Sequence, residues 1–355
     1  MPTIRVLVVE DSMTVRQRLI EILSADPEIE VVGEAGDGKQ AIELCQRLRP
    51  SLITMDMMLP VMTGLAATEF IMAHCPTPIL IVSASVNRGE LFKTYDALAA
   101  GAVDVLDKPS GTEMDGVWEG RFIAATKMVS RIRVITHPRA RLIEQKRSRP
   151  TPPGPARTGG GRYELVAIGT STGGPGAIVE VLRGLPTDFR LPILFVLHIN
   201  EPFGIAFADW LDGQTDRRVA YGREGEPIAD AAGRVIMAPA GQHLTVRDGL
   251  VHLTRAPERH SCRPSVDVLF ESIAHEYGAR AVACLLTGMG RDGAEGLLRL
   301  RQAGALTIAQ DEASSVIYGM PREAAMLGAA NEILPLPEIG PRLALIGAQA
   351  RGASS

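Results

Sequence analysis

The sequence predicts an α/β protein of two domains, each built on an open, mostly parallel sheet. Short apolar runs alternate with stretches whose apolar residues recur at helical spacing, a pattern typical of βα units. The chain has 355 residues, more than one hydrophobic core usually organises. A segment rich in Pro, Gly and Arg interrupts the alternation at residues 127–162 and separates the two predicted domains.

The first predicted domain covers residues 1–126. Its strand-like runs are short and apolar, and they alternate with amphipathic stretches such as residues 13–25 and 39–48. Five strands and five helices fill this length without a long structureless loop. The predicted strands are residues 5–9, 31–33, 52–55, 79–82 and 103–106.

The second predicted domain follows the linker. Residues 127–162 cannot bury enough apolar surface to offset the entropy lost on ordering, so we interpret them as an extended, solvated spacer. Their basic cluster is the one feature that would suit nucleic acid or an acidic partner. The βα alternation resumes after Tyr163 and predicts a doubly wound domain at residues 163–346, followed by a tail at 347–355. Three of its strand-like runs are residues 165–168, 193–197 and 281–286.

The composition argues against several classes of protein. Aromatic residues make up only 4% of the chain, which leaves little stacking surface for single-stranded nucleic acid. The formal net charge of −4 gives no overall attraction to nucleic acid or to a membrane surface. No apolar run approaches the ~20 residues of a spanning helix, and the first one soon turns acidic, unlike a signal peptide. We therefore expect no nucleic-acid partner and no membrane insertion.

The cysteines indicate the compartment. Cys45, Cys75, Cys262 and Cys284 show no paired spacing of the kind that holds a metal. They fit reduced thiols, and we expect a cytoplasmic protein. No coiled-coil heptad pattern is present, so we expect a monomer.

An acidic pocket is predicted in the first domain. Glu10 and Asp11 end the first strand and Asp56 ends the third, and these strand ends are neighbours in a doubly wound sheet. Three carboxylates that close together call for a hard divalent cation, most simply Mg²⁺. Ser83 and Lys108 end the fourth and fifth strands, and a hydroxyl and an ammonium there suit an incoming phosphoryl group. Asp56 is the predicted nucleophile that becomes an aspartyl phosphate.

These residues stand in the motifs Val-Val-Glu-Asp-Ser, Met-Asp-Met-Met-Leu-Pro, Ser-Ala-Ser and Asp-Lys-Pro. With them, this domain resembles the receiver domain of response regulators. The resemblance implies a flavodoxin-like order of five parallel strands and phosphorylation of Asp56 by a histidine kinase. It further implies that Mg²⁺ is held by Glu10, Asp11, Asp56 and the backbone carbonyl of Met58.

Three side chains with catalytic chemistry follow strands of the second domain. Ser171 lies in Gly-Thr-Ser-Thr-Gly, the pattern of a nucleophile elbow, which presents a hydroxyl at a helix amino terminus. Among the seven histidines, His198 alone follows a wholly apolar strand, and Asp292 follows the run at 281–286. If the strands are parallel, a nucleophile, a base and an orienting carboxylate meet at one crevice. A glycine-rich phosphate loop is the alternative for the Ser171 motif, but its spacing and its Lys are missing.

The second domain resembles the catalytic domain of the chemotaxis methylesterase CheB. The matching stretches include Ile-Gly-Thr-Ser-Thr-Gly-Gly-Pro, Cys-Arg-Pro-Ser-Val-Asp-Val-Leu-Phe and Leu-Leu-Thr-Gly-Met-Gly-Arg-Asp-Gly-Ala. The resemblance implies hydrolysis of γ-glutamyl methyl esters on the cytoplasmic region of chemoreceptors, together with deamidation of receptor glutamines. It makes Ser171 the nucleophile, His198 the general base and then acid, and Asp292 the group that orients the imidazole.

These roles define an acyl-enzyme reaction that needs no cofactor. Ser171 attacks the ester carbonyl, His198 takes its proton, methanol leaves, and water hydrolyses the acyl-enzyme. The backbone N–H groups of Thr172 and Met289 are the predicted oxyanion donors. The loop at Gly288 has few side-chain obstacles and can bring its backbone close to the nucleophile.

One departure from the family surrounds the histidine. The family usually reads Gln-His-Met-Pro, whereas this chain reads Leu-His-Ile-Asn from Leu197 to Asn200. The leading hypothesis is a methylesterase whose unphosphorylated receiver domain covers the crevice. Three alternatives stay open at this point: a DNA-binding response regulator with a helix-turn-helix after the receiver, a catalytically silent receptor-binding adaptor, and the same chemistry in a pathway other than chemotaxis.

Overall fold

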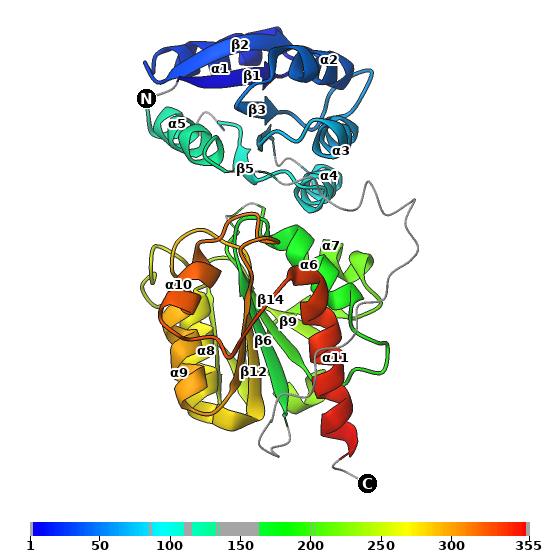
Figure 1. The fold of residues 1–355 in the computed structure, drawn as a ribbon, viewed down its shortest axis with the longest axis vertical. Coiled ribbons are helices and arrows are strands. Elements are labelled where there is room, and N and C mark those ends of the chain that lie inside the picture. The colour runs from blue at the N-terminus through cyan, green and yellow to red at the C-terminus, as the bar shows by residue number, and fades with distance from the viewer. Residues whose placement is uncertain are drawn as a thin grey trace. The chain divides into compact units, whose positions relative to one another are not determined.

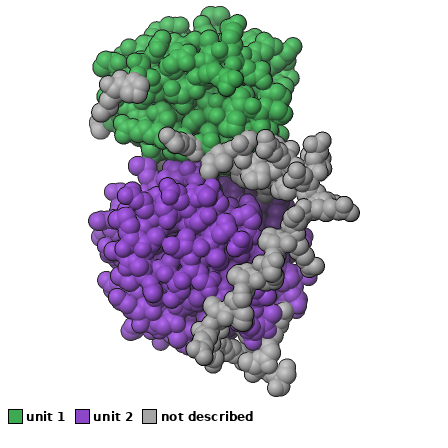
Figure 2. Space-filling model, in the orientation of Figure 1, with its two compact units in different colours: residues 1–149 green, residues 150–355 purple. Residues whose placement is uncertain are grey.

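The computed structural model describes residues 3–84, 87–109, 116–132, 134, 163–199, 201 and 203–352. The chain divides into two compact units, Met1–Arg149 and Pro150–Ser355 (Figure 2). This division falls within the predicted linker at residues 127–162. Residues 135–162 of that linker lie outside the described part of the chain, as does Asn200.

Unit 1 contains a five-stranded parallel sheet with the order β2-β1-β3-β4-β5. This confirms the predicted flavodoxin-like order, in which the order of the strands reverses between β1 and β3. The second strand is longer than the predicted residues 31–33, because it pairs along the whole of β1. The strands are β1 (Ile4–Val9), β2 (Ile29–Ala35), β3 (Leu52–Met55), β4 (Ile79–Ser83) and β5 (Asp104–Asp107).

Helices cover both faces of this sheet, which explains why its strands read as continuous apolar runs. Two helices lie on one face and three on the other (Figure 1), and each face has its own buried cluster. Side chains of Ser12, Asp37, Thr63 and Asn87 cap the first four helices. The helices are α1 (Met13–Ser24) and α5 (Val117–Val129) on one face, and α2 (Gly38–Leu48), α3 (Gly64–His74) and α4 (Arg88–Ala99) on the other.

Unit 2 contains a seven-stranded sheet with the order β14-β13-β12-β6-β7-β9-β8, in which every pair is parallel. The order reverses between β6 and β12, so the crevice at their carboxyl ends is the expected ligand position. The three strand-like runs of the sequence are β6, β7 and β12. The strands are β6 (Leu165–Thr170), β7 (Ile193–Leu197), β8 (Val219–Tyr221), β9 (Val235–Met237), β12 (Ala281–Leu285), β13 (Leu306–Gln310) and β14 (Glu332–Leu334).

The helices of unit 2 also form two layers. α8 (Val266–Glu276), α9 (Ala294–Gln302) and α10 (Met320–Met326) lie on one face of the sheet (Figure 1). On the other face lie α6 (Gly174–Arg183), α7 (Phe207–Gln214) and α11 (Leu336–Gly352). Unit 2 is thus an α/β domain rather than the helix-turn-helix that a DNA-binding regulator requires.

The last helix, α11, continues past residue 346 into the segment predicted as a tail, and Ile339, Leu343 and Ile346 are fully buried along it. Within the described ranges, no helix combines the length and the apolarity needed to cross a membrane.

An antiparallel hairpin interrupts the βα alternation that the sequence predicts for this unit. It consists of β10 (His243–Arg247) and β11 (Leu250–Thr254). Asp248 and Gly249 join the strands with φ angles of 52° and 72°. Asp-Gly is a common two-residue hairpin turn, so the sequence does carry a local signal for this element.

Candidate functional site

The three predicted carboxylates of unit 1 come together at the point where its strand order reverses. Glu10 and Asp11 follow β1 and Asp56 follows β3, and one oxygen of each lies within 4.8 Å of the others. Glu10 and Asp56 are buried, with 1% and 4% of their surface exposed, whereas Asp11 is exposed. Oxygen atoms at this spacing are the ligands that Mg²⁺ prefers in proteins.

Lys108 neutralises part of this charge. Its Nζ atom lies 2.7 Å from Glu10 Oε2 and 2.9 Å from Asp56 Oδ2. Burial alone would lower the pKa of Lys108, but the two carboxylates raise it above its ordinary value. Burial raises the pKa of Glu10, with Asp56 adding to the effect and Lys108 opposing it. Lys108 therefore remains a cation beside Asp56.

Ser83 ends β4, the strand that pairs with β3, and has a buried hydroxyl. It is 1% exposed, and its Oγ atom forms no hydrogen bond with any described residue. A buried hydroxyl without a partner costs about 1–3 kcal/mol. The Met58 N–H donates to Asp56 Oδ1 over 3.4 Å, which holds the backbone of Met58 beside Asp56. The pocket thus has carboxylates that fit a divalent cation and an unpaired donor that fits an anion.

In unit 2, the ends of β6, β7 and β12 are joined through their backbones. The Ser171 N–H donates to the carbonyl of Thr287, which follows β12, over 3.0 Å. The His198 N–H donates to the carbonyl of Thr170 over 3.1 Å. Ser171 and His198 therefore sit on adjacent strand ends at the crevice where the strand order reverses.

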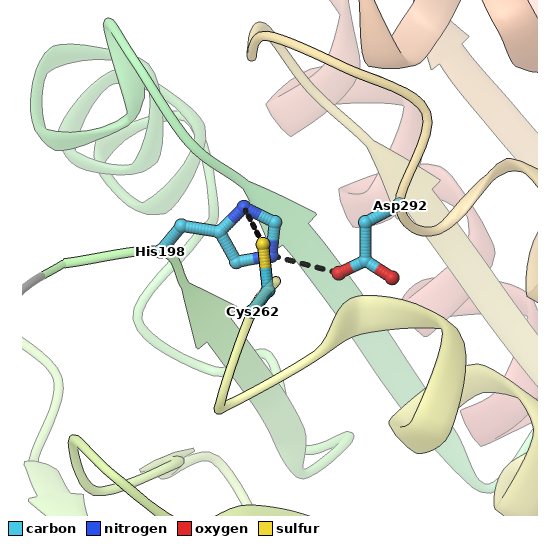
Figure 3. Close-up of side chains that lie close together, drawn as sticks. All are labelled: His198, Cys262 and Asp292. Atoms are coloured by element: carbon cyan, nitrogen blue, oxygen red, sulfur yellow. Dashed lines mark hydrogen bonds and ion pairs between the residues drawn. The ribbon is translucent and has the colours of Figure 1, made fainter. Parts of the chain in front are cut away.

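His198 and Asp292 form a direct pair, as Figure 3 shows. His198 Nε2 lies 2.7 Å from Asp292 Oδ2, and Asp292 is 2% exposed. Burial would lower the pKa of His198, but the hydrogen bonds of Asp292 and Cys262 raise it to about 9. Burial would raise the pKa of Asp292, but His198, Ser265 and the Val266 N–H lower it to about 2. The carboxylate therefore stays ionised and stabilises an imidazolium.

The amino terminus of α8 supplies the other partners of Asp292. Ser265 Oγ and the N–H groups of Val266 and Asp267 donate to its two oxygens over 2.7, 2.7 and 3.1 Å. A carboxylate at a helix amino terminus is favoured by the helix dipole. Gly169 lets α8 approach this closely, because a Cβ at that position would lie 2.2 Å from a methyl group of Val266.

The contact between the predicted nucleophile, Ser171, and the predicted base, His198, is not formed in this structure. Ser171 Oγ makes no hydrogen bond within the described part of the chain, and the second ring nitrogen of His198, Nδ1, forms a hydrogen bond of 3.6 Å with the Sγ atom of Cys262 (Figure 3). Catalytic hydrogen bonds often tighten only when substrate is bound. The structure thus joins two of the three predicted catalytic residues directly and places the third on the neighbouring strand end.

The two predicted oxyanion donors lie on loops that are fixed to each other. Thr287 Oγ1 donates to the Thr172 carbonyl over 3.0 Å, and the Gly288 N–H donates to Ile317 over 3.1 Å. A Cβ on Gly288 would lie 2.8 Å from the Ser171 Cβ, so this loop is packed against the nucleophile. In the described ranges, no acceptor is found for the N–H groups of Thr172 and Met289. Both donors are therefore available to a ligand.

Cys262 is the residue at this site that the sequence did not single out. It closes a tight turn in which the backbones of Arg259 and Cys262 bond to each other, over 2.9 and 3.2 Å. His260 and Ser261 at its centre have φ angles of 51° and 60°, which cost roughly 1–2 kcal/mol for each residue that is not glycine. A single cysteine in a polar segment gives no sequence signal, because only the tertiary fold brings it to His198.

Other supporting residues were also missed. Gln310 is fully buried at the end of β13, and its Oε1 atom accepts from the Thr287 N–H over 2.8 Å. Ser265 caps α8, and a serine just before an apolar helical stretch is a signal that could have found it. Of the two departures beside His198, Leu197 is 1% exposed and belongs to the core, while Asn200 lies outside the described residues.

Comparisons with known proteins match both units. Residues 6–114 match the response regulator receiver domain, and residues 166–343 match the CheB methylesterase family. A protein-glutamate methylesterase/protein-glutamine glutaminase of Anaeromyxobacter dehalogenans is 43% identical over 337 residues, covering 95% of each chain. One from Syntrophus aciditrophicus is 43% identical over 342 residues, covering 95% of this chain and 96% of the relative. The Thermotoga maritima CheB catalytic domain is 32% identical, with a TM-score of 0.49, and covers 52% of this chain and 98% of that one.

Proposed function

This chain belongs to the CheB methylesterase family, and from that premise we propose that it hydrolyses glutamyl methyl esters of chemoreceptors under the control of phosphorylation at Asp56. The observation that carries the catalytic assignment is the 2.7 Å pair of His198 and Asp292, with Ser171 on the adjacent strand end. The same site is proposed to deamidate receptor glutamines, as the names of its relatives suggest.

The contact between His198 and Asp292 supports a role for the other ring nitrogen in proton transfer. Asp292 occupies Nε2 of His198, so Nδ1 is the atom that takes the proton as Ser171 Oγ attacks the ester carbonyl. The developing oxyanion accepts from the N–H groups of Thr172 and Met289, each worth roughly 3 kcal/mol. Nδ1 then gives its proton to the leaving oxygen, and methanol departs. Water hydrolyses the acyl-enzyme by the same proton transfers in reverse.

Deamidation follows the same route with a different leaving group. The carboxamide carbon of glutamine accepts Ser171 Oγ, and the proton on Nδ1 passes to the amide nitrogen, which leaves as ammonia. Both substrates give the same acyl-enzyme and the same glutamate product. One site therefore serves both reactions.

The pocket of unit 1 is proposed to receive the phosphoryl group. Mg²⁺, when bound, would be held by Glu10, Asp11, Asp56 and the backbone carbonyl of Met58, and it would offset the charge of the incoming phosphoryl group. Among the described residues, the hydroxyl of Ser83 has no hydrogen-bond partner, and it could donate to a phosphoryl oxygen. Lys108 keeps a positive charge beside Asp56.

The partners follow from these two chemistries. A histidine kinase supplies the phosphoryl group, and the cytoplasmic region of a methylated chemoreceptor is the substrate, so we place the protein in the cytoplasm as a monomer. Phosphorylation can relieve inhibition only to the extent that the phosphorylated receiver domain favours the open state of the crevice over the covered state.

Methanol release from methylated receptor tests the proposal. The full-length protein is assayed with and without acetyl phosphate and Mg²⁺, beside Ser171→Ala and Asp56→Asn. We expect the donor to stimulate the wild type, Ser171→Ala to lose release, and Asp56→Asn to keep only its unstimulated rate. Release that survives in Ser171→Ala would refute the catalytic assignment. A folded wild type that binds receptor without releasing methanol would instead indicate an adaptor.

A further inference from the structure

We propose that Cys262 is a site of oxidation by hydrogen peroxide, and that its oxidation to a sulfenic acid stops His198 from acting as a base. The proposed oxidation is inferred from the geometry of three side chains, Cys262, His198 and Asp292 (Figure 3). Its effect on turnover rests on the proposed function. The two parts are measured separately below.

The three side chains form a thiol–imidazole–carboxylate series. Cys262 Sγ lies 3.6 Å from His198 Nδ1, and His198 Nε2 lies 2.7 Å from Asp292 Oδ2. A carboxylate on one ring nitrogen and a thiol on the other is the arrangement by which proteins turn a cysteine into a nucleophile. Cys262 therefore faces an imidazole ring whose positive charge is held by a carboxylate behind it.

The other cysteines have no such acceptor. Cys284 and Cys45 are 0% and 1% exposed. Burial raises the pKa of the Cys284 thiol well above its usual range, and burial and Cys45 raise that of Cys75 to about 12. Cys262 is only partly buried, so a molecule as small as peroxide can reach it. The three remaining thiols serve as internal controls.

The reaction balances with peroxide as the two-electron oxidant. The thiol proton leaves Sγ for a solvent base, and the thiolate sulfur attacks one peroxide oxygen beside the positively charged ring of His198. The O–O bond breaks as the S–O bond forms, sulfur loses two electrons, and the departing hydroxide becomes water by taking a proton. The product is the sulfenic acid of Cys262.

Oxidation at this position acts on the catalytic base. The added oxygen lies against Nδ1, the nitrogen that has to take the proton of Ser171, and its O–H group can donate to that nitrogen. Two equivalents of a small thiol reverse the change, giving back the Cys262 thiol, a disulfide of the small thiol, and water.

The first experiment measures the oxidation of each cysteine directly. Full-length protein is treated with peroxide in the presence of dimedone, which traps sulfenic acids, and the adducts at each cysteine are measured by mass spectrometry. We expect the adduct at Cys262, and several-fold less of it in His198→Gln near pH 7, because that variant lacks the charged ring beside the attacking sulfur. Labelling of Cys262 no greater than that of Cys75, or unchanged in His198→Gln, would overturn the proposal.

The second experiment measures methanol release before and after treatment with peroxide. Peroxide should remove methanol release from the wild type, and dithiothreitol should restore it. Cys262→Ala and Cys262→Ser should each keep, after peroxide, the same rate that they show before it. Loss of release in both variants would exclude Cys262 as the cause. If Cys262 is trapped in a His198-dependent way but no methanol is released even without peroxide, the oxidation site stands and the proposed function fails.

Discussion

Asp292 Oδ2 lies 2.7 Å from His198 Nε2, and the other ring nitrogen, Nδ1, lies 3.6 Å from Cys262 Sγ. The carboxylate itself accepts from a side-chain hydroxyl and two backbone N–H groups at the start of α8. The orientation of the imidazole is therefore determined by the backbone of a helix and not by a mobile side chain alone. The charge on this pair leads to the first prediction.

The pH dependence of kcat/KM should follow His198. Burial alone would lower the pKa of His198, but Asp292 and Cys262 raise it to about 9. The base is the neutral imidazole, so kcat/KM should rise as the pH increases from 7 and should level off above about 9. Initial rates of methanol release across this range check the prediction. A profile already level at pH 7 would contradict it.

Asp292→Asn should lower both activity and stability. The amide has one acceptor oxygen where the carboxylate has two, so at least one buried donor at the start of α8 loses its partner, at about 1–3 kcal/mol in unfolding free energy. We expect kcat to fall roughly 10³–10⁴-fold. Denaturant unfolding and turnover are measured beside Asp230→Asn, an exposed aspartate outside the site. Equal effects of the two substitutions would argue against the assigned role.

Gly288→Ala tests how closely the loop after β12 approaches the nucleophile. The new Cβ would lie 2.3 Å from Met320 Sδ and 2.8 Å from Ser171 Cβ, so the loop or these two residues would have to move. A displacement of about 1 Å at the reacting atoms costs on the order of 10²-fold in rate. The matched control is Gly213→Ala in α7, where a Cβ meets nothing within 4 Å. Turnover should fall in the first variant and stay unchanged in the second.

Ser83→Ala should separate signalling from stability. Ser83 Oγ has no hydrogen bond to lose in the described part of unit 1, so the unfolding free energy should stay the same or rise slightly. Stimulation by acetyl phosphate should weaken, because a donor to the phosphoryl group is gone. Thr126→Val in α5 removes another buried hydroxyl without a partner and should leave the stimulation intact. A large loss of stability in Ser83→Ala would show that its hydroxyl has a structural partner.

The sequence predicts the fold class well because parallel strands buried on both faces are continuous apolar runs. The apolar runs of β7 and β12 are evident in the sequence for this reason, and the rule that strand ends meet then brings His198 and Asp292 together. β8 and β9 have three residues each, which is too short for a periodic pattern to stand out. The hairpin of β10 and β11 was missed although its Asp-Gly turn is a local signal.

The sequence does not reveal what surrounds the site. Cys262 reaches His198 only because of a strained turn, and Gln310 supports Thr287 from another strand. Neither contact can be predicted from hydrophobic periodicity or from motif spacing, because each contact joins segments that are far apart in the sequence. Positions at strand ends could thus be predicted, whereas contacts set by turns and neighbouring strands could not.

The reversal of strand order between β6 and β12 also fixes when the site can exist during synthesis. Ser171 and His198 leave the ribosome long before Asp292, and Gln310, which holds the Thr287 N–H, comes later still. The last described helix of unit 1 ends at Val129, so that unit can fold while no esterase is present. A nascent chain therefore carries its regulator before it carries anything to regulate, and a chain released before β13 is complete would lack this support for its active site.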